Sequence, residues 1–432
     1  MPPRARGRRV RSALPVRAAA FVLLALGRPA AAMTVFQVGG TLSLNYSITT
    51  PAPEPGGLVL QFSPAVALHT GSERLVWRVG YAFTGTLNLF GAGETAYSNQ
   101  LNLGLAAELS DRAAMFVSGG FVQGGAAQVL LQKPAELGQP ELRAPGNPAQ
   151  ITATLGETVA WEASERLRFA ETVSGTVVAQ QDDLSQYNAS VSAWLRFDRT
   201  LAMDAIGGEL FSSVASMRAL TAAGERYLTV TNSLVGSWRH DVDVRWSGHL
   251  RAGIAQVVTL TGSVPLAIVP TGSLIASYQI GRTAGGSLVL SYGPNTDLQT
   301  GTTTQAGSVL LRGFVALEAA RPRFLSASAG FLRSRSLGEV PGLAAGVGDA
   351  VQGDLGVLWG LSDLFLATAR GTLAYQFNQP AGIAPSLVFA VIAGVMFRYG
   401  NAAALPPMPT MGQRVDGSDA VPFSSKGAVH EP

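Results

Sequence analysis

The chain of 432 residues has no cysteine, few charges, and no long apolar run after its N-terminus. The absence of cysteine fits an oxidising compartment in which the fold needs no disulfide bonds. Charged residues make up 14% of the sequence, against roughly 25% in soluble globular domains. No apolar stretch of about 18 residues follows residue 32, which excludes transmembrane helices.

Residues 1–32 have the three parts of a secretory signal peptide. Six arginines without an acid precede the apolar segment "AAAFVLLALG", and small residues ending in Ala32 follow it. The apolar segment is too short to span a bilayer, so we predict cleavage after Ala32.

Removal of this segment reverses the sign of the charge. It takes away seven arginines and leaves 24 basic residues against 28 acidic ones, a net charge of −4. The high sequence pI therefore belongs to the signal peptide, and no nucleic-acid partner is expected.

Residues 74–89, "RLVWRVGYAFTGTLNL", alternate between apolar and small or polar side chains. One parity holds Leu75, Trp77, Val79, Tyr81, Phe83, Leu87 and Leu89, and the other holds Arg78, Gly80, Ala82, Thr84, Thr86 and Asn88. Because side chains alternate across a strand, this pattern predicts one long β-strand with an apolar and a polar face.

The same alternation recurs along most of the chain, at 36–48, 97–109, 187–197, 244–254, 273–280, 351–361 and 365–377. The expected strands have about ten to fourteen residues, which suffices for a tilted bilayer crossing. Sandwich strands are shorter, at about five or six residues, and a solenoid would show a fixed sequence repeat, which is not found.

Short and long connections alternate along the sequence. Short turns are expected near 71–73, 110–112, 163–166, 198–200, 240–242, 281–283, 321–323 and 361–363. Together with nine longer connections they predict an all-β, antiparallel up-and-down transmembrane barrel of about eighteen strands. Sixteen strands is the alternative, because the parity is blurred at 201–216 and 305–334.

The last expected strand, "SLVFAVIAGVMFRYG", contains Gly394, Phe397 and Tyr399 in a G-x-x-F-x-Y spacing. This spacing resembles the C-terminal assembly signal of bacterial outer-membrane β-barrels. The resemblance covers about residues 34–399 and implies an outer-membrane location, lipid contacts and recognition by the barrel-assembly machinery. We expect the barrel to occupy 33–399 and the polar, Pro-rich residues 400–432 to form a disordered periplasmic tail.

The polar parity should face the lumen, since the apolar parity faces lipid. It places inside the barrel Arg78, Arg168, Arg196, Arg245, Arg251, Arg312, Arg370 and Arg398, with the acids Glu108 and Asp354. An excess of arginines in a narrow aqueous passage favours anions. Alternatively, these arginines cluster near the periplasmic ends of the strands and bind acids or water.

Glu157 and Glu171 fall on the lipid parity, where a carboxylate is costly. We expect either a β-bulge that shifts the register or a contact with another subunit.

The sequence predicts no enzyme, metal or cofactor. Of four histidines, His240 lies beside Asp241 and Asp243 in an expected turn, and His69 and His249 face the lumen without a serine or acid pattern. No G-x-S-x-G motif and no metal-ligand spacing occurs.

The longest connection, 123–150, either folds into the channel or forms an outer adhesive loop. The leading function is a channel for hydrophilic, anionic solutes or polymer, with both termini periplasmic. An arginine-lined eighteen-strand barrel is similar in architecture to exopolysaccharide export pores, which work with periplasmic polysaccharide-export proteins. A passive general porin, a lipid transporter and a plugged structural or adhesin barrel are the alternatives.

Overall fold

A computed structural model describes the chain from Met33 to Tyr399, apart from 51–56, 73, 91–95, 125–149, 182, 219–225, 244, 261–265, 281–282, 299–301, 319–322, 338–346, 363 and 378–384. The predicted signal peptide, the predicted C-terminal tail and most of the longest connection lie outside the described residues, so the expectations for them stay predictions. No helix in the described ranges is long and apolar enough to cross a membrane.

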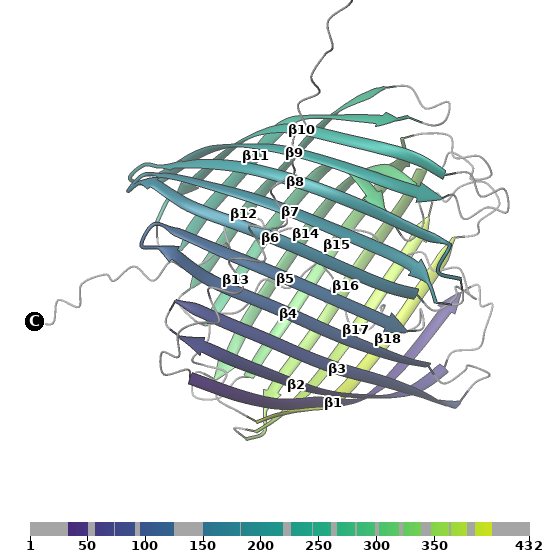
Figure 1. Ribbon diagram of the computed structural model, residues 1–432. Coiled ribbons are helices and arrows are strands. Elements are labelled where there is room, and N and C mark those ends of the chain that lie inside the picture. The colour runs from purple at the N-terminus through teal and green to yellow at the C-terminus, as the bar shows by residue number, and fades with distance from the viewer. Residues whose placement is uncertain are drawn as a thin grey trace, which may run out of the picture.

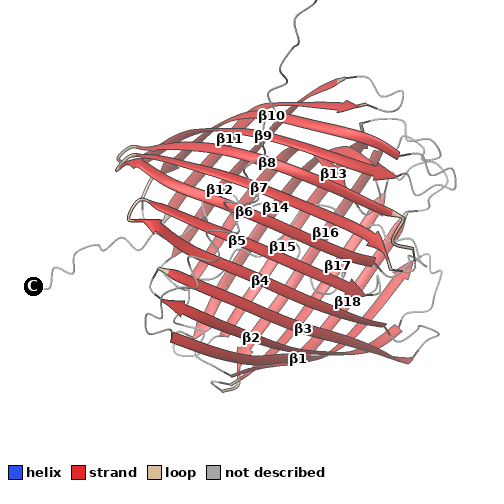
Figure 2. Ribbon diagram, viewed as in Figure 1, coloured by secondary structure: helices blue, strands red, loops and turns tan. Residues whose placement is uncertain are grey.

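Eighteen antiparallel strands form one closed sheet, in which each strand pairs with its neighbours in sequence and β1 pairs with β18 (Figures 1 and 2). They are β1 (Met33–Thr50), β2 (Gly57–Ser72), β3 (Leu75–Phe90), β4 (Ala96–Ser110), β5 (Ala113–Gly124), β6 (Gln150–Ser164), β7 (Leu167–Gln180), β8 (Tyr187–Thr200), β9 (Asp204–Arg218), β10 (Arg226–Asp241), β11 (Trp246–Thr259), β12 (Ala267–Ile280), β13 (Ala284–Asp297), β14 (Thr302–Glu318), β15 (Arg323–Ser336), β16 (Val347–Gly360), β17 (Phe365–Phe377) and β18 (Ser386–Tyr399). The predicted barrel is confirmed with eighteen strands, and the sixteen-strand alternative is wrong.

The strands cross the wall with one apolar and one polar face, as the alternation predicts. In β3, Val79 and Leu87 are 41% and 49% exposed on the outside, whereas Thr84 on the inside is 2% exposed. A closed sheet pairs its backbone groups internally, so such a wall can stand in lipid.

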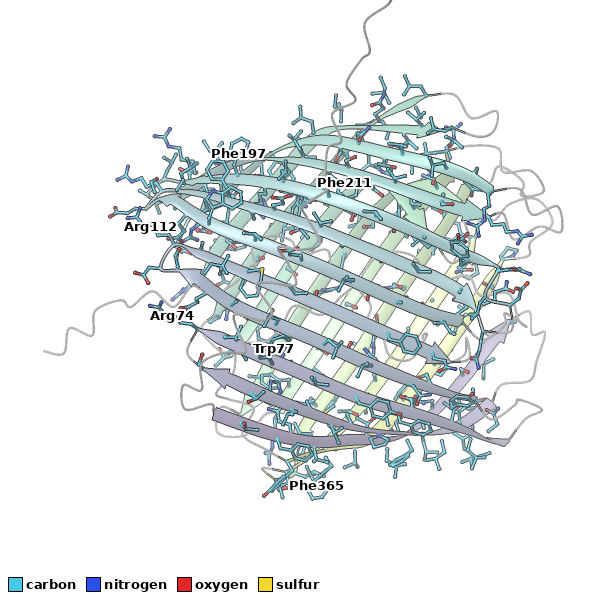
Figure 3. The ribbon with its side chains drawn as sticks, in the orientation of Figure 1. Arg74, Trp77, Arg112, Phe197, Phe211 and Phe365 are labelled. Atoms are coloured by element: carbon cyan, nitrogen blue, oxygen red, sulfur yellow. The ribbon has the colours of Figure 1, made fainter. Side chains whose placement is uncertain are left out.

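The two ends of the barrel differ. Short turns join the strands at the left end in Figure 1, which we call the tight-turn end, and the longer connections lie at the right, the long-loop end. Aromatic pairs are in contact at the tight-turn end: Trp161–Phe169, stacked, at 5.4 Å, and Trp246–Tyr278 and Phe365–Phe397, tilted, at 4.3 Å and 5.3 Å between ring centroids. Figure 3 shows Arg74 and Arg112 in turns at this end. Aromatic bands of this kind mark the membrane interfaces of transmembrane barrels.

The expected bulge at Glu157 and Glu171 is wrong. The register between β6 and β7 is continuous from Gln150 to Glu162, with Glu157 opposite Val173 and Glu171 opposite Val159, and shifts only between Glu162 and Ser164. Both carboxylates are therefore exposed on the outer face.

Candidate functional site on the inner face

Most of the predicted lumenal arginines share one face and one end of the barrel. Those on the inner face are Arg78 in β3, Arg168 in β7, Arg196 in β8, Arg251 in β11, Arg312 in β14 and Arg370 in β17. Each lies within seven residues of the tight-turn end of its strand. Their positions match the interpretation that the arginines gather toward one end rather than along the whole passage.

Three other predicted residues lie at the edge of this region. Arg245 lies one residue before β11, where its carbonyl accepts from the Gln279 N–H of β12 at 2.9 Å and its own N–H donates to Asp243 at 2.7 Å, so it stands at the rim of the wall. Arg398 lies opposite Gly39 in the β1–β18 register, and its side chain is outside the described residues. Glu108 is exposed on the inner parity, close to the end of β4.

Asp354 and Arg370 form a tightly bonded cluster on β15, β16 and β17. One carboxylate oxygen of Asp354 accepts from Arg370 Nε at 3.1 Å, from its Nη2 at 2.8 Å, and from the Thr372 hydroxyl at 2.7 Å. The other oxygen accepts from the Ser328 hydroxyl at 3.1 Å. The Asp354 side chain is 8% exposed, so its carboxylate is satisfied by these protein donors rather than by bulk water.

A ladder of three ion pairs runs around the wall from β6 to β11: Arg168–Glu162 at 2.9 Å, Arg196–Asp198 at 2.6 Å, and Arg251–Glu209. The register links the rungs, because Arg168 lies opposite Asp198 and Arg196 lies opposite Glu209. Each arginine thus has a carboxylate beside it. The predicted excess of inner positive charge is largely cancelled in this sector.

Sequence reasoning missed the acids of this ladder. Glu209 lies on β9, where the inward Phe211 and outward Ser212 blur the alternation. Its partner Arg251 is two strands away, on β11, so only the three-dimensional register brings them together. Asp198 and Glu162 stand beside expected turns, where the parity is hardest to read.

Gly207 leaves the space in which Asp198 sits. A Cβ at Gly207 would come within 2.4 Å of Asp198 Oδ1 and 2.7 Å of the Ser237 hydroxyl. The absence of a side chain here is therefore a condition for the Arg196–Asp198 pair.

Arg78 is held differently from the paired arginines. Its Nε donates to Nδ1 of His69 at 2.8 Å, and Nε2 of His69 lies 3.2 Å from Oε1 of Gln37. Since Nδ1 accepts, His69 is neutral and carries its proton on Nε2, which donates to Gln37. No carboxylate of the described residues forms an ion pair with Arg78. Arg78 thus brings a positive charge to the inner face without a compensating acid.

The connection between β13 and β14 narrows the long-loop end. β13 pairs with β12 only as far as Tyr292, so residues 293–298 separate from β12, while β14 stays bonded to β15 as far as Thr303. At the end of this segment, the carbonyl of Leu298 accepts from Asn188 Nδ2 at 2.7 Å, although Asn188 is on β8, five strands away. We call residues 293–298, which end the β13 arm, the inward hairpin.

The inner face near the inward hairpin mixes apolar side chains with the buried Thr229 and Thr231 of β10. Ala215, Met217, Val257 and Val269, on β9, β11 and β12, are all buried there. In this sector the predicted polar lumen is interrupted by apolar side chains.

The histidines belong to no potential metal-binding group in the described ranges. His240 Nδ1 lies 2.8 Å from Asp204, not from Asp241 or Asp243 as the sequence pattern indicated. No group of three or more potential metal ligands occurs among the described residues.

The residues of the predicted assembly signal lie in the strand that closes the barrel. Gly394 faces Ser43 of β1, where a Cβ would come within 2.8 Å of the serine Cβ, and Tyr399 is exposed opposite Val38. The ring of Phe397 contacts that of Phe365 on β17 in a tilted arrangement. Their use as a signal stays a prediction.

The molecule combines eighteen antiparallel strands with an apolar outer face and aromatic pairs near one rim. The architecture is that of an outer-membrane β-barrel. No protein-family model and no curated protein matches the chain.

Solved structures of similar fold include three outer-membrane proteins. OccK2 (OpdF) of Pseudomonas aeruginosa is 11% identical with a TM-score of 0.48, over 84% of this chain and 98% of that one. OpdK of the same organism, solved with vanillate, is 11% identical with a TM-score of 0.49, over 84% and 99%. OccAB3 of Acinetobacter baumannii is 11% identical with a TM-score of 0.48, over 85% and 99%. At this identity the likeness concerns the fold alone.

Proposed function

We propose that the protein is an outer-membrane channel that passes small hydrophilic solutes and favours anions. Arg78 carries this proposal, because its guanidinium is held by neutral His69 while Arg168, Arg196, Arg251 and Arg370 each have a carboxylate partner. The paired arginines contribute dipoles to the passage, and Arg78 contributes a net charge.

The size of the effect follows from Coulomb's law. A unit charge about 5 Å from a permeating ion is worth about 0.8 kcal/mol even at the dielectric constant of water, or about fourfold in local concentration. Salt screening reduces this value and the low-dielectric wall increases it. One uncompensated arginine is therefore enough for a measurable anion preference.

The test is the reversal potential of the purified protein in a planar bilayer, under a salt gradient of about tenfold. Arg78→Gln should move it toward cation preference. The double variant Asp354→Asn/Arg370→Gln removes an ion pair with no net charge and should leave it unchanged. A wild type that does not conduct, or an Arg78→Gln variant with wild-type selectivity, would contradict the proposal; the first result would favour a plugged structural barrel.

The inward hairpin favours small solutes over a polymer. The bond from Asn188 to Leu298 ties chain across part of the long-loop end, and a polysaccharide would have to pass it. Exopolysaccharide export with a periplasmic polysaccharide-export protein stays a separate prediction, and glycosyltransferase genes beside this gene would support it.

We also propose that the tight-turn end and both termini are periplasmic, since short turns lie on that side in bacterial barrels. A protease site placed within 335–348 should be cleaved on whole cells, and one at residue 426 should not. Cleavage at 426 alone would reverse this orientation.

A further inference from the structure

Glu157 and Glu171 are the two carboxylates that the described strands expose on the outer face away from the strand ends. Glu157 lies in the middle of β6, and Glu171 lies five residues into β7. The others on the outer parity, Asp204 and Asp349, are within three residues of a strand end. A carboxylate at such a depth is unfavourable against lipid.

Among the residues that the structure describes, no cation reaches the two glutamates on the outer face. The described outward arginines are all within about one turn's length of a strand end: Arg199, Arg218, Arg226, Arg323, Arg333 and Arg335. Arg199, on β8, pairs in register with Leu167, four residues before Glu171. Rotation about the membrane normal preserves depth, so a second copy would not bring an arginine to them either.

The neighbouring outer positions are apolar or small. β5 presents Val117 and β8 presents Leu195 beside the glutamates, and neither strand places a titratable group next to them. Gly175 and Ala193 lie one step further toward the long-loop end. Small residues there allow a second wall to approach closely.

The two glutamates stand at nearly the same depth. Glu157 lies opposite Val173, and Glu171 is two residues nearer the tight-turn end than Val173. In a tilted strand this displacement places Glu171 about 5 Å nearer the tight-turn end along the barrel axis. The strands β4–β9 slope down from the tight-turn end to the long-loop end in Figure 1, so the step from β6 up to β7 moves toward the long-loop end. The step from β6 to β7 moves Glu171 back toward the long-loop end by about 3 Å. The two carboxylates therefore lie within about 2 Å of the same depth in the membrane.

This arrangement is self-complementary under a two-fold axis along the membrane normal. An axis between β6 and β7 places Glu157 of one copy opposite Glu171 of the other, twice. Two facing carboxyl groups can share one proton in a hydrogen bond, which removes one of the two charges. We propose that β6 and β7 form the core of a homodimer interface closed by two shared-proton Glu157–Glu171 pairs.

The interface should depend on pH. Each Glu157–Glu171 pair must keep one proton to form its hydrogen bond. The dimer is therefore favoured at low pH and weakens when that remaining proton is lost at higher pH. Glutamine at both positions keeps amide hydrogen bonds without titration. Leucine at both positions makes the face suitable for lipid and removes the hydrogen bonds.

The natural absence of cysteine gives a direct probe. Val173→Cys places a single thiol near the proposed axis, and Leu355→Cys places one at a similar height on β16, nine strands away and so on the opposite side of the ring. The purified full chain is reconstituted in phospholipid vesicles and oxidised at about pH 5 and about pH 9. The amount of disulfide-linked dimer is measured for each variant, and the amount for Val173→Cys is divided by that for Leu355→Cys. This ratio cancels the effect of pH on thiol reactivity, which is common to both variants.

We expect this ratio to be about tenfold or more at the lower pH and to fall at the higher one. The Glu157→Gln/Glu171→Gln background should keep a high ratio at both pH values, and the corresponding double leucine background should bring it to about one. A ratio of about one in the parent at both pH values overturns the proposal, and so does a double leucine variant that still cross-links. Heat-modifiable gel migration verifies that each variant is folded, and the outcome is independent of whether the barrel conducts.

Discussion

Replacing Asp354 with alanine removes the acceptor of four hydrogen bonds and the only described ion-pair partner of Arg370. Loss of one member of a buried ion pair typically costs about 3–5 kcal/mol, because the other charge stays desolvated. The Arg370 side chain is 32% exposed, so water can partly replace the carboxylate. We therefore expect the free energy of unfolding to fall by about 2–3 kcal/mol.

The assay is unfolding by denaturant in detergent or lipid vesicles, followed by tryptophan fluorescence and compared at constant m-value. Glu162→Ala is the matched control, since it removes the carboxylate of an ion pair whose arginine is 55% exposed. It should cost less than about 1 kcal/mol. Equal losses for the two variants would refute the argument that burial sets the difference. A loss near zero for Asp354→Ala would show that Arg370 finds another partner.

Four further outcomes are expected. Asn188→Leu should release the inward hairpin and raise single-channel conductance. Gly207→Val should displace Asp198 and lower stability by about 1–3 kcal/mol in the same denaturant assay. Hydrogen bonds from Ser185 and Gln186 lower the pKa of Asp183, so they stabilise its turn at neutral pH and are lost as pH falls through the lowered pKa; proteolysis of this turn should increase in acid. Phe397→Ala should lower the amount of assembled barrel, whereas deletion of 401–432 should not.

Each of these outcomes can fail in a specific way. Unchanged conductance in Asn188→Leu would mean that the inward hairpin is held by other contacts. Gly371→Ala is the control for Gly207→Val, because a Cβ at Gly371 meets nothing within 4 Å, and equal losses would contradict the steric argument. Acid-insensitive proteolysis would remove the role of Asp183, and damage from the tail deletion alone would place the assembly signal elsewhere.

The wall of the barrel could be predicted because a two-residue period is a local property of the sequence. In β3 the residue parity alone separates Val79 and Leu87 from Thr84, and the structure keeps that separation. β9 resisted because Phe211 faces inward and Ser212 outward, which contradicts the simple rule of an apolar exterior and a polar interior.

The charge pattern of the inner face was harder to predict. Parity puts an arginine inside the barrel but does not say which strand places an acid beside it, and the Arg251–Glu209 pair joins strands that are not adjacent. His69 and Arg78 were both expected inside the barrel and lie opposite each other on β2 and β3. Parity alone does not show that the neighbour of Arg78 is a hydrogen-bonded histidine rather than an acid. The sequence did single out Glu157 and Glu171, because a carboxylate on the wrong parity is a local anomaly.

The pairing of β1 with β18 has a consequence for how the chain folds. Seventeen of the ladders join strands that are consecutive in sequence, so each can form as a hairpin soon after its second strand is available. The last ladder joins Val38 to Tyr399 and so has the longest loop to close, which makes it the slowest step. Until it forms, the edge of β1 presents unpaired N–H and C=O groups, the template on which strands aggregate. The chain must therefore be kept from aggregating until β18 arrives, and the rate of that final closure should limit how fast the barrel matures.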